Sequence, residues 1–477
     1  MLSRGWARKQ LRHRPGRVLC EPGNPPAINP GVIASAGTGS RTRSASAPAG
    51  CELGWLPKKN TNAAGRLLLA VLVIKATLWA GVLTALTLWG PPLPPAPGGI
   101  IRWPQQGEAV FLSHFATWDA AHYLLLAELG YAKGAASCAF YPLLPMILRA
   151  SWKLSGANPA IVGLVLCNLC SLAAWTLFHR LVARRWGETA AWWALLFLIV
   201  YPGSLFFQFI YTESLFLLLL MGVWWGLETG RSGRAAVCAG LLPLCRGVGA
   251  FAVLPLAWHA LRTARPRGME RRQPRLRPPA TAALSMPDGA EKGPGTGSSR
   301  PRSGLAENLA FRHWRPWVVA GMPVLGWCVY LGLMWHWTGN PFEGFEAQKR
   351  WGVHSVANLW DVPKFLTGFL SAREWHAFKG SFLDRCVFVL FLYTLPVLWR
   401  LDKGLWTWAL VLGVLPAMSG TFTSFIRFAS CAFPMFVALG VVLSRPTRRW
   451  WGAGLLAVFL VLHAVLVWQY VNFRWAG

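Results

Sequence analysis

Long apolar stretches separated by short polar segments dominate this chain. The first runs from about Leu67 to Leu88, close to the roughly 20 residues that a helix needs to cross a bilayer core. Further apolar segments lie near 140–155, 158–178, 189–211, 212–227, 235–261, 316–337, 383–400, 404–420, 428–444 and 452–470. The pattern predicts an all-α polytopic membrane protein with about nine to eleven spans.

Composition supports a membrane protein and excludes two other classes. Of the 477 residues, 54% are hydrophobic and 14% are charged, whereas a soluble protein usually has about 25% charged residues. An ordinary cytosolic enzyme and a disordered or fibrous chain are therefore excluded. The excess of 47 Lys and Arg over 18 Asp and Glu could indicate nucleic acid. However, the basic residues flank apolar segments, as the positive-inside rule describes, so we expect no nucleic-acid partner.

Two basic, low-complexity regions divide the chain. Residues 1–63 are rich in Arg, Pro, Gly and Ser and lack the apolar core of a signal peptide, which predicts a disordered basic leader. Residues 262–315 hold 12 Lys and Arg against 4 acidic residues, which predicts a disordered basic cytoplasmic loop. They delimit an N-terminal transmembrane module at 64–261 and a C-terminal one at 316–477.

The basic regions also set the expected orientation. If 1–63 and 262–315 are cytoplasmic, the polar loops 91–139 and 338–382 and the turn 420–427 lie on the opposite, outer face. Three polar loops then converge on one side of the membrane. A carboxylate of the first loop is thereby expected to meet guanidinium groups from distant helices.

The basic stretch 179–188 is also expected on the cytoplasmic side, but this is not possible if every preceding and following apolar segment crosses the membrane. It lies inside only if either 140–155 or 235–261 is re-entrant rather than spanning. Both segments contain proline, at Pro142, Pro145 and Pro243. The pattern is compatible with either choice.

The first outer loop carries the most informative polar residues. On a helix, Trp118, Asp119 and His122 present neighbouring faces, and Tyr123 lies one turn after Asp119. Aromatic rings pack on the apolar face of a sugar, and a carboxylate accepts a hydroxyl proton, so the group suits sugar chemistry. An interfacial aromatic belt with an ordinary loop aspartate explains the same spacing equally well.

Arg246 and Glu213 are ionisable residues within apolar segments, where charge is costly and usually functional. Arg246 is expected to have a functional role, whereas Glu213 fits a buried polar network or a substrate contact equally well. Cys167 and Cys170 form a CxxC without a second pair or a histidine nearby, which favours small core thiols over a metal or redox site. No His and Asp cluster has convincing metal-ligand spacing, so no metal is expected.

Five sequence blocks, in order, resemble the GPI mannosyltransferase 2 (PIG-V-like) family. The first is WDAAHYLLLAELGY, followed by AFYPLLP with Tyr141. The others are YPGS with YTESLF, AGL with CRGVG, GNPF with Gln348 and Trp351, and SFIRF with Pro434. Together they span about 110–435. Thr117 and Cys245 depart from the family pattern, in which Arg and Thr are usual at these positions.

The resemblance implies a GT-C-like helical bundle whose first outer loop is catalytic. Such a glycosyltransferase takes a hexose, typically mannose, from a dolichyl or polyprenyl phosphate and gives it to a glycan or glycolipid acceptor; eukaryotic members form an α-1,6 linkage on the GPI glycan. The donor is a substrate, and no cofactor is required. The expected substrate-binding residues are Trp118, His122, Tyr123, Tyr141, Glu213, Arg246, Gln348, Trp351 and Arg427.

Reaction chemistry agrees with this expectation. An inverting displacement needs one base to accept the acceptor hydroxyl proton, and Asp119 is the best candidate. The departing phosphate needs positive charge, which Arg246, Arg427 or the Lys349–Arg350 pair could provide.

Two other functions compete with this one. A transporter or flippase of lipid-linked glycans also needs many spans with a few buried charges, although no corresponding broken segments are evident in the sequence. A scaffold that binds anionic lipid through its basic tails leaves Asp119, Glu213 and Arg246 unexplained. The Arg-, Ala-, Gly- and Trp-rich composition and the lack of an N-x-[ST] sequon favour a bacterial inner membrane over the endoplasmic reticulum.

Overall fold

The computed structural model describes residues 61–89, 101–106, 110–264, 314–352 and 354–477. Almost all of the predicted basic leader (1–63) and of the predicted basic loop (262–315) lies outside these residues. Within the described part the chain is helical, and its only β-type contacts are two isolated bridges. The predicted all-α class is confirmed.

Five helices in this part are long and apolar enough to cross a membrane. They are α1 (Thr61–Trp89), α4 (Pro159–Trp186), α10 (Arg315–Thr338), α13 (Phe382–Leu401) and α18 (Arg449–Val471). Local chemistry sets the ends of α4: the Asn158 side chain caps its first turn, and Gly187 ends it at a φ of 87°. The predicted multi-pass membrane protein is confirmed.

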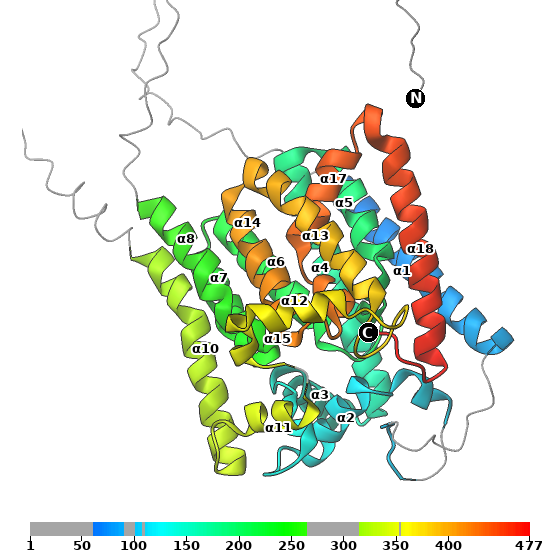
Figure 1. Cartoon of the computed structure of the whole chain (residues 1–477), viewed down its shortest axis with the longest axis vertical. Helices are drawn as coiled ribbons and strands as arrows, with labels where there is room; N and C mark the ends of the chain where they lie inside the picture. The colour runs from blue at the N-terminus through cyan, green and yellow to red at the C-terminus, as the bar shows by residue number, and fades with distance from the viewer. Residues whose placement is uncertain (1–60, 90–100, 107–109, 265–313, 353) are drawn as a thin grey trace, which may run out of the picture. The chain divides into compact units, whose positions relative to one another are not determined.

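The other apolar segments form helical hairpins rather than simple spans (Figure 1). The first is α5 (Glu188–Val200), η3 (Pro202–Phe207) and α6 (Thr212–Glu228); the second is α7 (Ser232–Cys245), η4 (Gly247–Ala252) and α8 (Val253–Ala264). The third comprises α14 (Lys403–Ala409), a π-turn (Leu410–Val414), α15 (Leu415–Gly420), α16 (Phe425–Ala429) and α17 (Phe433–Leu443). Each hairpin enters the bundle and turns back within it.

Both segments considered for re-entry are irregular. Segment 235–261 breaks after Cys245, where Arg246 has an extended backbone, and its two arms return to the same end of the bundle. Segment 140–155 becomes α3 (Leu143–Ser155), a 13-residue helix too short to span. Its buried side, which includes Leu144 and Leu148, faces the protein, so α3 packs beside α2 (Asp119–Leu129) instead of crossing.

Basic residues gather at one end of the bundle. Arg185, at the end of α4, forms ion pairs with Glu228 at the end of α6 and with Asp402 after α13, the latter at 2.8 Å. Arg231 and Lys403 lie at the adjacent helix starts. By the positive-inside rule this end is predicted to face the cytoplasm.

The predicted outer loops meet at the opposite end. There α2 and η2 (Ala136–Ala139) lie beside α11 (Glu343–Trp351), with α12 (Val362–Leu370) nearby (Figure 1). The Trp351 indole donates to the carbonyl oxygen of Ala136 at 3.1 Å. The convergence of distant polar loops, expected from the charge pattern, is therefore seen in the structure.

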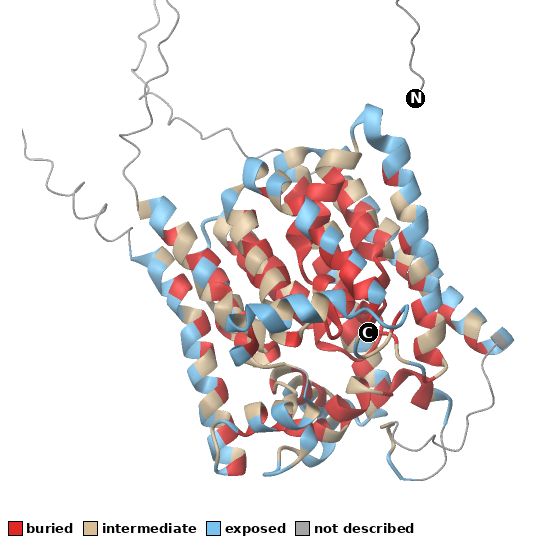
Figure 2. Ribbon diagram, viewed as in Figure 1, coloured by how far each residue is buried: buried red, intermediate tan, exposed pale blue. Residues whose placement is uncertain are grey.

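The buried core occupies the middle of the bundle, whereas α1 and α10 expose many apolar side chains, as lipid-facing helices do (Figure 2). Close helix approaches depend on glycine. A Cβ on Gly440 of α17 would lie 2.6 Å from the Cβ of Ala194 on α5, and one on Gly326 of α10 would lie 1.9 Å from the Gly240 carbonyl oxygen of α7. Such small-residue contacts are typical of helix packing in membranes.

Candidate active site

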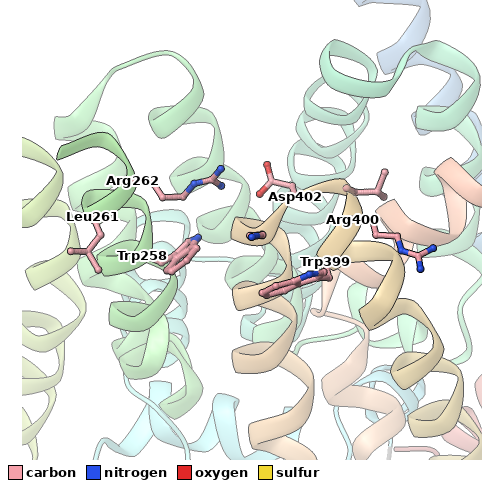
Figure 3. Close-up of a pocket in the computed structure, with 8 residues that line it drawn as sticks. Trp258, Leu261, Arg262, Trp399, Arg400 and Asp402 are labelled. Atoms are coloured by element: carbon pink, nitrogen blue, oxygen red, sulfur yellow. The ribbon is translucent and has the colours of Figure 1, made fainter. Parts of the chain in front are cut away.

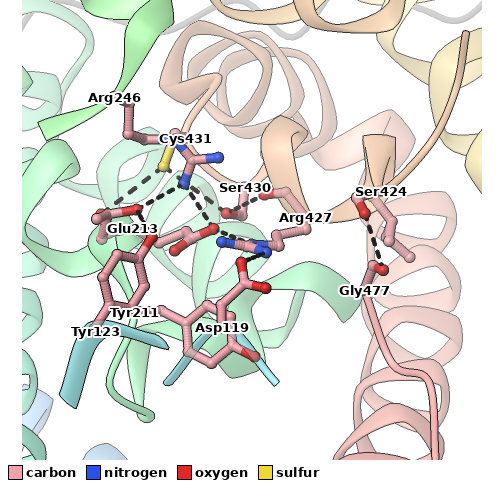
Figure 4. A network of polar contacts seen from close by, with 12 residues as sticks. Asp119, Tyr123, Tyr211, Glu213, Arg246, Ser424, Arg427, Ser430, Cys431 and Gly477 are labelled. Atoms are coloured by element: carbon pink, nitrogen blue, oxygen red, sulfur yellow. Dashed lines mark hydrogen bonds and ion pairs between the residues drawn. The ribbon is translucent and has the colours of Figure 1, made fainter. Parts of the chain in front are cut away.

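Asp119 lies in the first turn of α2, in the first outer loop. Its carboxylate accepts a hydrogen bond from Nη1 of Arg427, which is located 308 residues later on α16 (Figure 4). The Asp119 side chain is 20% exposed and that of Arg427 is 10% exposed. The pair thus joins the N-terminal and C-terminal modules and leaves the aspartate accessible.

Glu213 lies behind this pair, in the first turn of α6, and its side chain is completely buried. Its Oε1 accepts hydrogen bonds from Nε of Arg427 at 2.5 Å and from Nη1 of Arg246 at 2.7 Å. A buried carboxylate is tolerated only when such partners compensate its lost hydration. Glu213 therefore belongs to a buried polar network, and Asp119 is the acid of this network that solvent can reach.

The network sits where three hairpins break. Glu213 follows η3, Arg246 occupies the break between α7 and η4, and Arg427 lies on the five-residue α16, whose preceding Ser424 has a φ of 56°. Irregular backbone at membrane depth occurs only where it is buried in protein or lines a cavity. The breaks thus deliver charged side chains to one place inside an otherwise apolar bundle.

Aromatic rings surround both guanidinium groups. The Arg427 guanidinium carbon lies 4.6 Å from the ring centre of Tyr211 and 5.2 Å from that of Phe206. The corresponding atom of Arg246 lies 4.6 Å from the ring centre of Phe428. These cation–π contacts hold the two cations in place while keeping water away from them.

Tyr123 connects α2 to the same network. Its hydroxyl lies 3.3 Å from Oγ1 of Thr212, and Nη1 of Arg246 donates to that oxygen at 3.4 Å. Burial raises the pKa of Tyr123 above its usual value, so the hydroxyl stays protonated and serves as a hydrogen-bonding group.

His122 and Trp118 flank Asp119 in aromatic surroundings. The His122 ring stacks on Phe140 at 4.6 Å and meets the edge of Trp351 at 5.3 Å. Burial lowers the pKa of His122, which keeps the ring neutral. Trp118 has a φ of 54° and packs edge-on against Trp475. Trp118 directly precedes Asp119, and His122 lies one turn after it on α2.

Tyr141 lies next to the break that carries Arg246. A Cβ on Gly247 would come within 2.1 Å of the Tyr141 hydroxyl oxygen, so glycine is needed for this approach. Burial raises the pKa of Tyr141 to about 12, although a hydrogen bond with Gln348 opposes the shift.

The predicted residues of the second outer loop have mainly structural contacts. Gln348 donates to the Ala139 carbonyl at 3.4 Å, which docks α11 on η2 together with Trp351. Arg350 pairs with Glu343 at 3.0 Å, and Lys349 is exposed. The structure does not bring the Lys349–Arg350 pair to the Asp119 network, so Arg246 and Arg427 are the two cations available there.

His354 is a residue of the site that the sequence analysis missed. Its ring meets Phe428 edge-on at 5.0 Å, and its Nδ1 lies 3.4 Å from the hydroxyl oxygen of Ser419. Burial lowers the pKa of His354 to about 4, and the nearby charges of Arg246 and Arg427 act in the same direction. Its only signal in the sequence is a histidine within the second polar outer loop.

Asp384, on α13, was also missed. It is fully buried, and its Oδ1 accepts the backbone N–H of Ile426 at 2.6 Å. It thereby anchors the short helix that presents Arg427. The sequence signal is an acidic residue at the beginning of an apolar segment.

The titration of His354 leads to a prediction on acid stability. An unfolded histidine binds a proton near pH 6.5, whereas folded His354 does so only near pH 4. The stability due to neutral His354 is therefore present above pH 6.5 and is lost as the pH falls towards 4. In detergent, the Tm of the wild type should drop several degrees more between pH 7 and 4.5 than that of His354→Gln.

The matched control is His336→Gln, which changes an exposed histidine near the outer end of α10. This variant should keep the acid sensitivity of the wild type. An equal drop in Tm for the wild type and His354→Gln would contradict the burial of a neutral imidazole at this position.

Within the described residues, no group of three or more His, Cys, Asp and Glu side chains could hold a metal ion. Cys167 and Cys170 are free thiols within α4, and Sγ of Cys167 donates to the Tyr211 carbonyl at 3.6 Å.

Comparison with known proteins finds a family match in the N-terminal module. Residues 69–265 match the family described as Mannosyltransferase (PIG-V). This segment contains Asp119, Glu213 and Arg246, and the match confirms the predicted family resemblance. The human protein "GPI alpha-1,6-mannosyltransferase 2" is 31% identical over 146 residues, which cover 28% of this chain and 29% of the human protein. The aligned region thus spans less than a third of this curated relative.

Solved structures of an archaeal glycosyltransferase are distant matches. The apo oligosaccharyltransferase of Archaeoglobus fulgidus is 14% identical, with a TM-score of 0.41, covering 86% of this chain and 56% of that one. A complex of the same enzyme with an inhibitory peptide and a dolichol-phosphate gives 12% identity, a TM-score of 0.39 and the same coverage. At this level of similarity, the GT-C-like arrangement remains a prediction from the family resemblance.

Proposed function

We propose that the chain is an integral-membrane glycosyltransferase. It transfers a hexose, most suitably mannose, from a dolichyl- or polyprenyl-phosphate donor to a lipid-linked or cell-surface glycan acceptor. The observation that carries this proposal is the ion pair between Asp119 of the first outer loop and Arg427 of α16, with the aspartate accessible at the outer side of the bundle. The family match over residues 69–265 supports the sugar class.

Each charged group has a role in an inverting transfer. Asp119 accepts the proton of the acceptor hydroxyl as that oxygen attacks the anomeric carbon. The bond from this carbon to the donor phosphate breaks, and the lipid phosphate leaves with the electron pair. Arg427 and Arg246 stabilise the charge on the departing phosphate, since guanidinium groups bind phosphate in two-point hydrogen bonds. Glu213, buried between them, sets their orientation.

The location of the network suits a donor anchored in the membrane. A polyprenyl chain remains in the bilayer while its phosphate and sugar lie at the boundary where α2, η2 and α11 meet. We place the protein in a bacterial inner membrane, on the composition of its sequence, with a polyprenyl-phosphate carrier as the donor lipid.

The direct test uses the purified full chain in liposomes with radiolabelled polyprenyl-phosphate mannose and a mixture of lipid-linked glycan acceptors. We expect label to appear in the acceptor fraction. A parallel reaction with the dolichyl-phosphate donor compares the two carrier classes. A preparation that is folded yet transfers no sugar from either donor would overturn the proposal.

A second candidate, a transporter of lipid-linked glycans, is favoured by one observation. Helices broken at membrane depth often form transporter binding sites, and three breaks meet at Glu213, Arg246 and Arg427. The same liposomes distinguish the two functions. Movement of a fluorescent lipid-linked glycan between leaflets without sugar transfer would establish the transporter.

A further inference from the structure

A cavity lies at the basic, predicted cytoplasmic end of the bundle, opposite the end that carries α2 and α11. It has a volume of about 440 Å³, a size typical of small-ligand sites, and separates α8 from the turn between α13 and α14 (Figure 3). Its walls are Trp258, Leu261, Arg262, Trp399, Arg400, Leu401, Asp402 and Lys403.

The cavity has an excess of positive charge. Arg262, Arg400 and Lys403 form no ion pair with any of the described residues. Asp402, the acidic residue of the lining, is already occupied: Oδ1 accepts the N–H of Gly404 at 2.6 Å, and Oδ2 binds Arg185. The lining therefore offers unpaired cations and no free carboxylate oxygen to oppose an anion.

A buried donor also lies in the wall of this space. Nε1 of Trp258 is buried and has no hydrogen-bond partner among the described residues. Figure 3 shows the Trp258 ring on the α8 wall below Arg262, whose guanidinium extends across the cavity towards Asp402. An indole N–H donates only, and a buried donor without an acceptor is costly. The missing partner is thus an acceptor atom.

Apolar surface continues from the cavity along the membrane-facing side of the helices. Leu261 is 49% exposed, Trp399 is 48% exposed, and Leu254, two turns before Leu261 on α8, is 56% exposed. Lys403 lies over the Trp399 ring, with its Nζ 4.7 Å from the ring centre. Tryptophan beside lysine or arginine at the end of spanning helices is typical of the headgroup layer of a bilayer.

We propose that this cavity binds the phosphodiester headgroup of an anionic membrane lipid. Arg262 and Lys403 hold the phosphate, the Trp258 indole donates to a headgroup oxygen, and an acyl chain follows Leu261 and Leu254. The apolar surface beside the cations favours a lipid over free phosphate, because a free anion would leave it uncovered. This site is separate from Asp119 and does not depend on the proposed transferase activity.

The test measures lipid binding to the full chain in phosphatidylcholine nanodiscs, with phosphatidylglycerol as the probe. The wild type should bind phosphatidylglycerol in preference to phosphatidylcholine. Because each juxtamembrane cation contributes about 1 kcal/mol, or about fivefold, the Arg262→Gln/Lys403→Gln variant should bind it about 25-fold more weakly. Trp258→Phe keeps the ring, removes the donor and should also weaken binding.

The matched control is Arg234→Gln, which removes a cation at the same end of the bundle. Arg234 lies 4.9 Å from the Trp225 ring and does not line the cavity. An equal loss of phosphatidylglycerol binding in this control would show that the lipid is attracted by the general positive charge of this surface, and it would overturn the proposal. So would displacement of phosphatidylglycerol by millimolar inorganic phosphate, which would identify a free-anion site. An unchanged Tm establishes that each variant is folded.

Discussion

Asp119→Asn should lower the rate of sugar transfer by about 10²–10⁴-fold, the usual contribution of a general base. The amide keeps the shape of the carboxylate and can still accept a hydrogen bond from Arg427, but it cannot take the acceptor proton. The measurement is kcat and KM for transfer from polyprenyl-phosphate mannose in liposomes. Loss of a general base should lower kcat strongly, with little change in the KM for the donor.

The control for this variant is Glu128→Gln on the same helix. Glu128 is exposed and accepts a hydrogen bond from the Trp103 indole at 3.2 Å, well away from the network. It should transfer sugar at the rate of the wild type. Full activity in Asp119→Asn would remove Asp119 from the base role, and a rise in KM alone would show that it positions Arg427 for donor binding.

Glu213→Gln should cause the largest loss of stability among single changes in the network. It leaves Arg246 and Arg427 buried with one carboxylate, Asp119, between them. Breaking a buried ion pair from one side typically costs about 3–5 kcal/mol. The free energy of unfolding in detergent should fall by this amount, and transfer should fall with it.

A double variant separates stability from chemistry in this prediction. In Glu213→Gln/Arg246→Gln the charges balance again, because Arg427 keeps its pair with Asp119. Stability should recover in part, whereas transfer should remain low because one of the two phosphate-binding cations is gone. Glu228→Gln serves as the control, since its partly exposed ion pair with Arg185 should contribute less than about 1 kcal/mol. An unchanged free energy of unfolding in Glu213→Gln would contradict the proposed contribution of the buried ion pairs to stability.

The sequence predicts the long helices well for a physical reason. A helix that faces lipid must be apolar over about 20 residues, and this requirement is visible in the sequence of α1, α4 and α10. Basic residues remain on the cytoplasmic side, so the charge pattern orients the loops. The contrast between charged and apolar residues also directs attention to Glu213 and Arg246, since ionisable groups stand out against apolar neighbours.

The hairpins were not predictable in the same way. Segments such as 189–211 and 404–420 are apolar because they are buried in protein, and burial in protein and burial in lipid select the same side chains. Hydropathy alone therefore reads them as spans. The breaks at Tyr201–Tyr211 and at Thr421–Ser424 depend on partners from other helices, such as the Tyr201 hydroxyl, which donates to the Ile426 carbonyl at 2.8 Å.

The amino-acid sequence by itself thus determined that this is a multi-pass helical membrane protein, which end of it is basic, and which charged residues are costly to bury. Only the tertiary structure decided which charges meet: Arg427 with both Asp119 and Glu213, His354 beside the two guanidinium groups, and Arg350 away from them. The reason is that composition and periodicity reflect only whether each segment is surrounded by water or by an apolar environment. Ion pairs between residues hundreds of positions apart depend on how the helices break and pack.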